Sequence, residues 1–206
     1  KENDKELFSS LVKHKLFFLF YRFFFWINKP KAIVLYVYYN IENMAMIRAA
    51  KTLNIPVIEV QHGTMGKYHI AYNFAKRGDY DFFPDYVFVW GQYWKETTRF
   101  PIPDERVIVT GFPYFEERVN ELNGKEKTSK KRVVLFISQW TIAEKLSKIA
   151  ANLSKIIDNN EYEIVYKLHP RNYGQWKKKY PWLKKDSIKV IDNSDKDIYY
   201  FLNEAE

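Results

Sequence analysis

Two of the four histidines directly follow predicted strands, and this placement is the strongest indication of chemistry in the sequence. His62 stands in the segment Val60-Gln61-His62-Gly63-Thr64, and His169 stands in Lys167-Leu168-His169-Pro170-Arg171. In a parallel sheet, ligands bind at the carboxyl ends of the strands. An imidazole there can act as a general base near neutral pH, or donate hydrogen bonds to phosphate and hydroxyl oxygens. One such histidine is more often a local strand cap, but two in two β-α series favour a functional site.

The neighbours of these histidines have residue types that suit a binding loop. Gly63 allows a tight turn and a close approach of a ligand to the backbone. Pro170 restricts the residue before it to an extended conformation, which keeps His169 in line with its strand. Lys167 and Arg171 flank that histidine and can pair with phosphate. Because side chains alternate along a strand, we expect Lys167 and His169 to share one side.

The remaining polar candidates are less clear. His69 lies in a tyrosine-rich stretch, where we favour a surface-loop histidine over a contact with an acceptor. His14 falls inside a predicted helix and is interpreted as incidental. Strand alternation places Glu59 on the same side as Gln61, and its role stays open.

The elements that must position these residues alternate between strand and helix. Apolar runs bounded by turn residues predict strands at 32–37, 56–60, 85–90 and 106–110, the first of them buried on both faces. Helical spacing predicts helices at about 5–28, 41–53 and 92–99, and a long loop or short helix at 64–83. A second series has strands at 132–137, 162–168 and 188–191, and helices at 142–157, 173–181 and from 197 onward.

This alternation predicts an α/β protein with two Rossmann-like β-α domains built on parallel sheets. We expect an N-terminal aromatic helix at 1–30, a first domain at 31–122, a polar linker at 123–131 and a second domain at 132–206. The second domain has roughly two or three β-α units fewer than a full Rossmann-like domain. The chain begins without Met and stops in mid-pattern, so we expect a segment of a longer protein that is inactive by itself.

The charge is uneven along the chain. The net charge is +8, and residues 125–186 hold 15 Lys and Arg against 6 Asp and Glu. Such a basic region suits an anionic partner, and a merely solvated lysine-rich surface is an equally good interpretation. The absence of cysteine excludes disulfides and thiolate metal sites, and a cytoplasmic location fits it.

An aromatic run at 16–26 resembles a membrane signal. Only 13 residues separate Lys15 from Lys29, and Arg22 interrupts them. A bilayer span needs roughly 18–20 apolar residues, so this segment is too short to cross. We favour a buried core helix. The alternative is an interfacial helix whose basic residues contact anionic head groups at the inner face of the cell membrane.

Four segments together resemble a group of enzymes, the GT-B transferases that build bacterial surface polymers. This group includes capsule glycosyltransferases, sialyltransferases and teichoic-acid glycerophosphotransferases. The resemblance covers roughly residues 32–206, and it rests on the two histidine segments, on Pro84-Asp85-Tyr86-Val87-Phe88-Val89-Trp90-Gly91 and on Val109-Thr110-Gly111-Phe112-Pro113. It implies an N-terminal acceptor domain and a C-terminal domain that binds a nucleotide-activated sugar.

The resemblance also implies roles for single residues. His62 would be the catalytic base that deprotonates an acceptor hydroxyl of a glycan or lipid-linked acceptor. The expected acceptor-side residues are Gln61, Gly63, Thr64, His69 and Gly111. The expected donor-binding residues are Lys167, His169, Pro170, Arg171, Ser138, Gln139 and Thr141. The last three surround Trp140 in a loop that a helix N-terminus would support as an anion site. We expect no metal, no cofactor and no nucleic-acid partner.

Two other interpretations remain open. UDP-sugar 2-epimerases share the GT-B architecture and a similar Thr-Gly-x-Pro segment, but they need catalytic carboxylates that the sequence does not reveal. The second alternative is a noncatalytic module that binds an anionic ligand through the basic 125–186 region. The donor, the acceptor, the linkage, the inverting or retaining outcome and the oligomeric state do not follow from the sequence.

Overall fold

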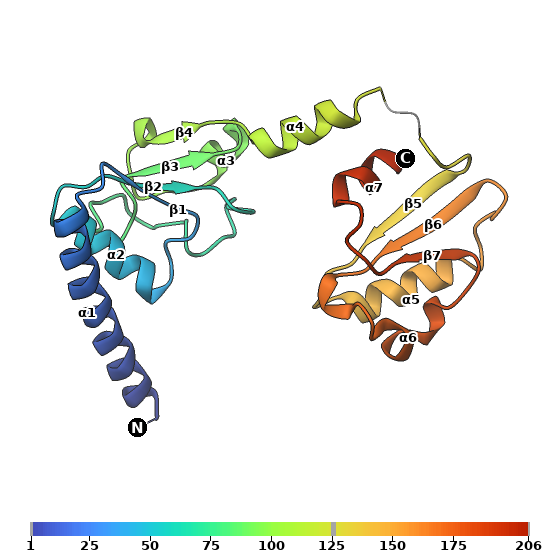
Figure 1. Cartoon of the computed structure of the whole chain (residues 1–206), viewed down its shortest axis with the longest axis horizontal. Helices are drawn as coiled ribbons and strands as arrows, with labels where there is room; N and C mark the ends of the chain where they lie inside the picture. The colour runs from blue at the N-terminus through green and yellow to red at the C-terminus, as the bar shows by residue number, and fades with distance from the viewer. Residues whose placement is uncertain (1, 125–126, 206) are drawn as a thin grey trace. The chain divides into compact units, whose positions relative to one another are not determined.

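The computed structural model describes residues 2–124 and 127–205, and it forms two compact units, Lys1–Phe112 and Pro113–Glu206 (Figure 1). Each unit contains one sheet of parallel strands. Parallel strands need crossover connections, which helices supply except between β2 and β3, where the segment is irregular. The α/β class predicted from the alternating pattern is therefore correct.

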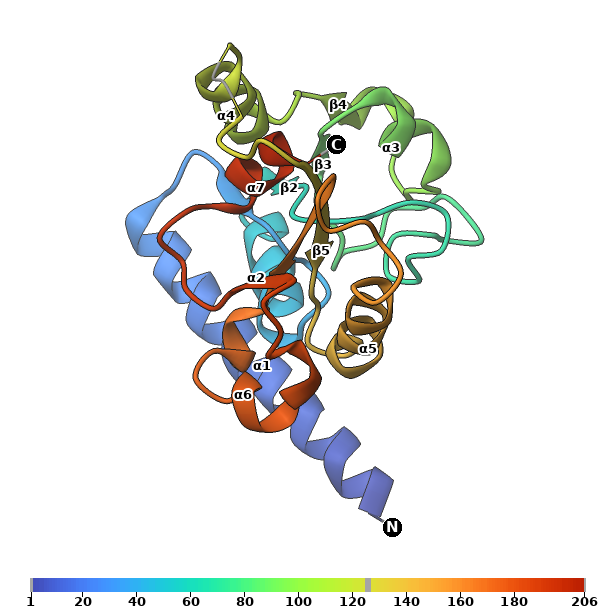
Figure 2. The ribbon, with the colours of Figure 1, turned by 90° about the vertical axis from the view of Figure 1, so that its right-hand side faces the viewer.

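The first unit begins with a long helix and continues with a four-stranded sheet in the order β1-β2-β3-β4. Its elements are α1 (Glu2–Asn28), β1 (Ile33–Leu35), α2 (Ile41–Lys51), β2 (Val57–Val60), β3 (Tyr86–Val89), α3 (Gln92–Thr97), η1 (Asp104–Arg106) and β4 (Val107–Val109). The side chain of Asn40 caps α2 by accepting a hydrogen bond from the backbone of Asn43. In Figure 2, α1 runs alongside α2 and its N-terminal turns extend past it.

The long segment between β2 and β3 has no regular structure but fills the core of the first unit. Met65, Tyr72 and Phe83 from this segment are buried and pack with Val57 of β2 and Ile47 of α2. A segment predicted as a long loop or short helix is therefore irregular, and its aromatic side chains supply core residues. This packing anchors the loop that carries His69.

The first strand differs from its prediction. The range 32–37 was expected to be buried on both faces, but β1 contains only three residues, and Val34 and Tyr36 are 65% and 69% exposed. Leu35 alone is buried, against the core that includes Ile47. The reason is that only one face of β1, an edge strand of the described sheet, is covered: Ile33 and Leu35 pack on the core, whereas Val34 points away from it.

The second unit contains a three-stranded sheet in the order β5-β6-β7. Its elements are α4 (Pro113–Leu122), β5 (Arg132–Ile137), α5 (Ala143–Leu153), β6 (Tyr162–Lys167), η2 (Pro170–Asn172), α6 (Trp176–Lys179), η3 (Pro181–Leu183), β7 (Ile188–Ile191) and α7 (Ile198–Glu204). One core cluster joins α5 to the sheet through Ala150, Ile164 and Tyr166. A smaller cluster joins the sheet to α7 through Phe201.

The boundary between the units lies before α4, whereas the sequence placed 113–122 in the first domain. Contacts with α7 assign α4 to the second unit: Arg118 pairs with Asp197 at 3.2 Å, and the ring of Tyr199 contacts those of Tyr114 and Phe115. Part of the predicted linker is also bound to α7, because the backbone of Thr128 donates to the carboxylate of Glu204. Residues 125–126 of that linker lie outside the described residues.

Candidate functional site

The carboxyl end of β2 presents His62 at the surface of the first unit. The hydroxyl of Tyr39 lies 3.4 Å from Nε2 of His62, and the rings of Tyr36 and Tyr39 both lie 6.2 Å from the imidazole. Partial burial, followed by the charge of His69, lowers the pKa of His62, and a hydrogen bond with the backbone of Tyr36 acts in the opposite direction. The exposed imidazole is therefore neutral near pH 7, as a proton acceptor must be.

A buried acid lies in the same segment, three residues before this histidine. The side chain of Glu59 in β2 is fully buried, and the hydroxyl of Tyr72 donates to its Oε1 at 2.5 Å. Burial raises the pKa of Glu59 to about 7, against the opposing effects of the hydrogen bonds from Tyr72 and from the backbone of Tyr38. Its Oε2 has no hydrogen-bond partner among the described residues. A protonated carboxyl group satisfies this environment better than a carboxylate does.

Aromatic rings connect the acid to the surface. The ring of Tyr72 lies 4.7 Å from that of His69, which lies 5.5 Å from the ring of Tyr39. His69 is half-buried rather than a free surface residue, and its Nδ1 is buried without a partner in the described part of the chain. The sequence left Glu59 without a role. A charged residue inside an otherwise apolar strand was the signal that could have found it.

The other residues expected on the acceptor side shape the loop. Gln61 is buried, and its side chain donates to the carbonyl of Gly63 and accepts from the backbone of Trp90, each at 2.8 Å. This side chain thus joins the ends of β2 and β3. A side chain placed at Gly63 would meet nothing within 4 Å, so this glycine leaves open space beside His62.

Thr64 is exposed, and Gly111 follows β4 with a φ of 78°. This left-handed backbone conformation favours glycine at position 111. Phe112 after it stacks on Trp90, with ring centroids 4.2 Å apart.

In the second unit, His169 and Arg171 lie in the loop after β6. Nδ1 of His169 accepts a hydrogen bond from the backbone of Arg171 at 3.2 Å, so in the neutral imidazole the proton resides on Nε2. The guanidinium carbon of Arg171 lies 5.7 Å from the ring of Trp140, in the loop after β5. The structure therefore brings together the two loops that the sequence predicted as one site. Pro170 opens η2, and Gln139 and Thr141 are exposed beside Trp140.

Two other predicted donor-binding residues, Lys167 and Ser138, form hydrogen bonds inside the second unit. Lys167 is buried, and its ammonium donates to the hydroxyl of Tyr173 at 2.7 Å and to the carbonyl of Asn193. Ser138 is buried and contacts the hydroxyl of Tyr166 at 3.3 Å. These contacts fix the loops after β5, β6 and β7 to one another. Gln139, Thr141 and Arg171 remain exposed, and His169 is half-buried.

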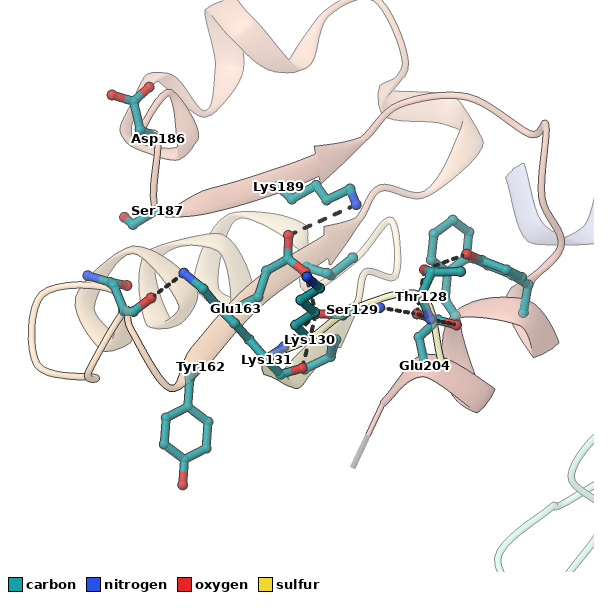
Figure 3. A pocket seen from close by; sticks show the side chains of 15 residues that line it. Thr128, Ser129, Lys130, Lys131, Tyr162, Glu163, Asp186, Ser187, Lys189 and Glu204 are labelled. Atoms are coloured by element: carbon teal, nitrogen blue, oxygen red, sulfur yellow. Dashed lines mark hydrogen bonds and ion pairs between the residues drawn. The ribbon is translucent and has the colours of Figure 1, made fainter. Parts of the chain in front are cut away.

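A cavity of about 630 Å³ lies elsewhere in the second unit (Figure 3). It is lined by residues at the amino ends of the strands, including Tyr162, Glu163 and Lys189, and by Glu204 of α7. Several of its charged groups already have partners: Lys189 lies 4.0 Å from Glu163, and Glu204 accepts hydrogen bonds from Thr128. Since ligands bind at the opposite ends of parallel strands, this cavity is not the candidate site.

The expectation of a metal-free site supposed that the chain has no Asp-x-Asp sequence, which is wrong, because two occur, at 79–81 and 195–197. Asp81 pairs with Arg48 at 2.8 Å, and Asp79 lies 3.7 Å from Lys51. Asp197 caps α7. Within residues 2–124 and 127–205, no three histidine or acidic side chains gather in a way that could hold a metal ion.

Comparison with solved structures supports the fold. The chain is similar to the UDP-GlcNAc 2-epimerase of Methanocaldococcus jannaschii, with a TM-score of 0.52 and 16% identity, over 92% of this chain and 57% of that one. It is also similar to MnaA of S. aureus in its structure with UDP, with a TM-score of 0.53 and 16% identity, over 92% and 53%. Neither a protein-family model nor a curated protein sequence matches the chain.

The chain thus spans little more than half the length of these two proteins. At such low identity the likeness shows a GT-B-like, Rossmann-type fold, and it confirms the predicted fold class. No helix in the described part of the chain is long and apolar enough to cross a membrane.

Proposed function

We propose that this chain is part of a glycosyltransferase that uses a nucleotide-activated sugar. The first unit holds the acceptor, a glycan or a lipid-linked saccharide, and the second unit holds the donor. The protein acts in the cytoplasm in the synthesis of a bacterial surface polysaccharide, and it needs no metal ion.

One observation carries this proposal, the exposed and neutral imidazole of His62 at the carboxyl edge of the first sheet. An acceptor hydroxyl is a poor nucleophile until a base removes its proton. Nε2 of His62 lies next to the hydroxyl of Tyr39, so this nitrogen already faces a hydroxyl group in the free protein. The open space beside Gly63 leaves room for an acceptor to approach.

The loops of the second unit support the donor half of the proposal. Nε2 of His169 carries its proton, so it can donate to a phosphate oxygen, and Arg171 adds a positive charge beside it. The helix α5 begins after the loop of Trp140, and no side chain caps its first backbone N–H groups. Such groups stabilise an anion, here the phosphate that leaves the sugar.

A sugar 2-epimerase is the second candidate, because a solved structure of similar fold has that activity. Moving a proton at a sugar carbon requires an accessible acid–base pair. Glu59, the acid at this edge of the first sheet, is sealed beneath Tyr72 and cannot reach a sugar in this conformation. The geometry therefore favours transfer.

Incubating the full-length protein with UDP-, GDP-, CDP- and CMP-linked sugars separates the candidates. A transferase releases nucleotide at a rate that depends on an added saccharide acceptor. An epimerase instead changes the sugar at C2 without any acceptor, which NMR detects. A donor at 100 times its dissociation constant also adds about 2.7 kcal/mol to the stability of the folded protein, so a thermal-shift screen identifies the nucleotide first. If the protein binds polyanions but no nucleotide sugar, both enzyme interpretations are excluded and the noncatalytic anion-binding module remains.

Replacing His169 by Ala should weaken donor binding by roughly 5- to 150-fold, since one hydrogen bond to a phosphate contributes about 1–3 kcal/mol. The matched variant His169→Gln keeps an N–H donor and should recover much of the affinity. Calorimetric titration of the donor measures both variants. An affinity unchanged in His169→Ala would remove this residue from the donor site.

A further inference from the structure

The helix α1 has two apolar faces, and only one of them is packed. Phe18, Tyr21 and Phe25 face the core of the first unit, where Phe25 is buried and the hydroxyl of Tyr21 donates to Glu42 of α2 at 2.5 Å. These residues recur at the three- and four-residue spacing of one helical face. They attach α1 to the core of its unit.

The opposite face of α1, here named the outer face, is apolar and exposed. Its large side chains are 41–69% exposed; they are Phe8, Val12, Leu16, Leu19, Phe20, Phe23, Trp26 and Ile27. With 3.6 residues per turn, these positions form one broad stripe, away from the face that carries Phe18 and Phe25. The rings of Phe23 and Trp26 stack with centroids 6.3 Å apart, so the stripe is continuous. Apolar patches of this extent on a soluble protein mark interaction sites.

Basic residues flank the outer face. By helical geometry, Lys15 and Arg22 lie along one side of the stripe and Lys13 along the other, and Lys29 follows the end of the helix. Residues 7–29 contain four basic residues and no Asp or Glu. A second copy of α1 would bring like charges together, whereas an anionic surface would complement them. The helix cannot cross a bilayer, so the partner must accept it lying flat.

We propose that the outer face of α1 docks onto the surface of an anionic lipid membrane. Phenylalanine and tryptophan side chains enter the boundary between head groups and acyl chains, where aromatic rings are favoured. Lys13, Lys15 and Arg22 extend along their aliphatic stems to the lipid phosphates. This contact is independent of the proposed catalysis and would hold the first unit beside lipid-linked molecules.

Co-sedimentation of the full-length protein with vesicles tests this proposal. We expect binding to vesicles of phosphatidylcholine with phosphatidylglycerol, and much weaker binding to phosphatidylcholine alone or at high salt. Replacing Phe20, Phe23 and Trp26 by Ser should abolish binding. Replacing Lys13, Lys15 and Arg22 by Gln should weaken binding on the order of 100-fold. The matched control replaces Tyr68 and Ile70 by Ser, because these apolar residues of the same unit are 85% and 93% exposed and belong to the segment between β2 and β3, not to α1. This control should bind like the wild type.

Circular dichroism establishes that every variant is folded before binding is compared. Absence of sedimentation with anionic vesicles at low salt would overturn the proposal. So would a wild-type protein that dimerises without lipid while the Phe20, Phe23 and Trp26 variant stays monomeric, since a second copy would then cover the outer face.

Discussion

Replacing His62 by Gln should lower the turnover of the full-length protein by about 10²- to 10⁴-fold, the usual contribution of a general base. Glutamine keeps the size and polarity of the imidazole but cannot accept the proton of an acceptor hydroxyl. Donor affinity and melting temperature should stay nearly unchanged, because His62 is exposed and lies on the unit proposed to hold the acceptor. Steady-state kinetics, donor titration and thermal melting measure these three quantities.

The matched control is His14→Gln, which removes a histidine of the same unit that lies on α1 away from the carboxyl edge. Its turnover should stay within a few-fold of the wild type. In the wild type, activity should fall as the pH drops through the lowered pKa of His62, since protonation removes the base. If His62→Gln keeps near-normal turnover, the base lies elsewhere. If its melting temperature falls sharply instead, His62 is a structural residue.

Raising the pH from 4.5 to 7 should lower the unfolding free energy of the first unit by about 3 kcal/mol, because Glu59 loses its proton in the unfolded state. Each unit of pKa difference between the folded and unfolded states corresponds to about 1.4 kcal/mol. The pKa of Glu59 is about 7 in the folded protein against 4.5 for an ordinary glutamate. Between these values the folded state holds a proton that the unfolded state has lost. The stabilisation is therefore complete below the lower value and disappears as the pH rises through the upper one.

Glu59→Gln should remove this pH dependence, because a neutral amide resembles the protonated carboxyl group. At pH 8 this variant should be more stable than the wild type, by up to about 3 kcal/mol. Urea unfolding at pH 5, 6, 7 and 8 measures the difference. Glu105→Gln is the control, since Glu105 is exposed in the same unit and its change should have no such effect. If the unfolding free energies of Glu59→Gln and the wild type change in parallel with pH, Glu59 does not titrate in this range.

Tyr72→Phe extends this test. The hydroxyl of Tyr72 favours the carboxylate of Glu59, so its removal should raise the pKa of Glu59 further. The loss of stability with pH should then begin and end at higher pH than in the wild type. If the loss of stability shifts to lower pH instead, the hydroxyl of Tyr72 does not stabilise the carboxylate of Glu59.

The order of the strands and the positions of His62 and His169 followed from the sequence, because they depend on local patterns, whereas the helix α4 was not predicted. Apolar runs with turn residues mark strands, and a parallel sheet brings their carboxyl ends to one edge. Thus β5, predicted at 132–137, begins and ends at those residues, and both histidines follow strands as expected. The positive charges along α1 and its inability to cross a bilayer were also visible in the sequence.

Burial and hydrogen-bond partners needed the tertiary structure, because they come from residues distant along the chain. Tyr72 makes Glu59 a buried acid, and Tyr39 contacts His62. The edge position of β1 exposes residues that look like core, and contacts with α7 assign α4 to the second unit. Likewise, the sequence shows the apolar residues of α1 as a single run. Only its packing on α2 shows that the helix has a covered face and an open one, since periodicity records which residues are apolar but not what covers them.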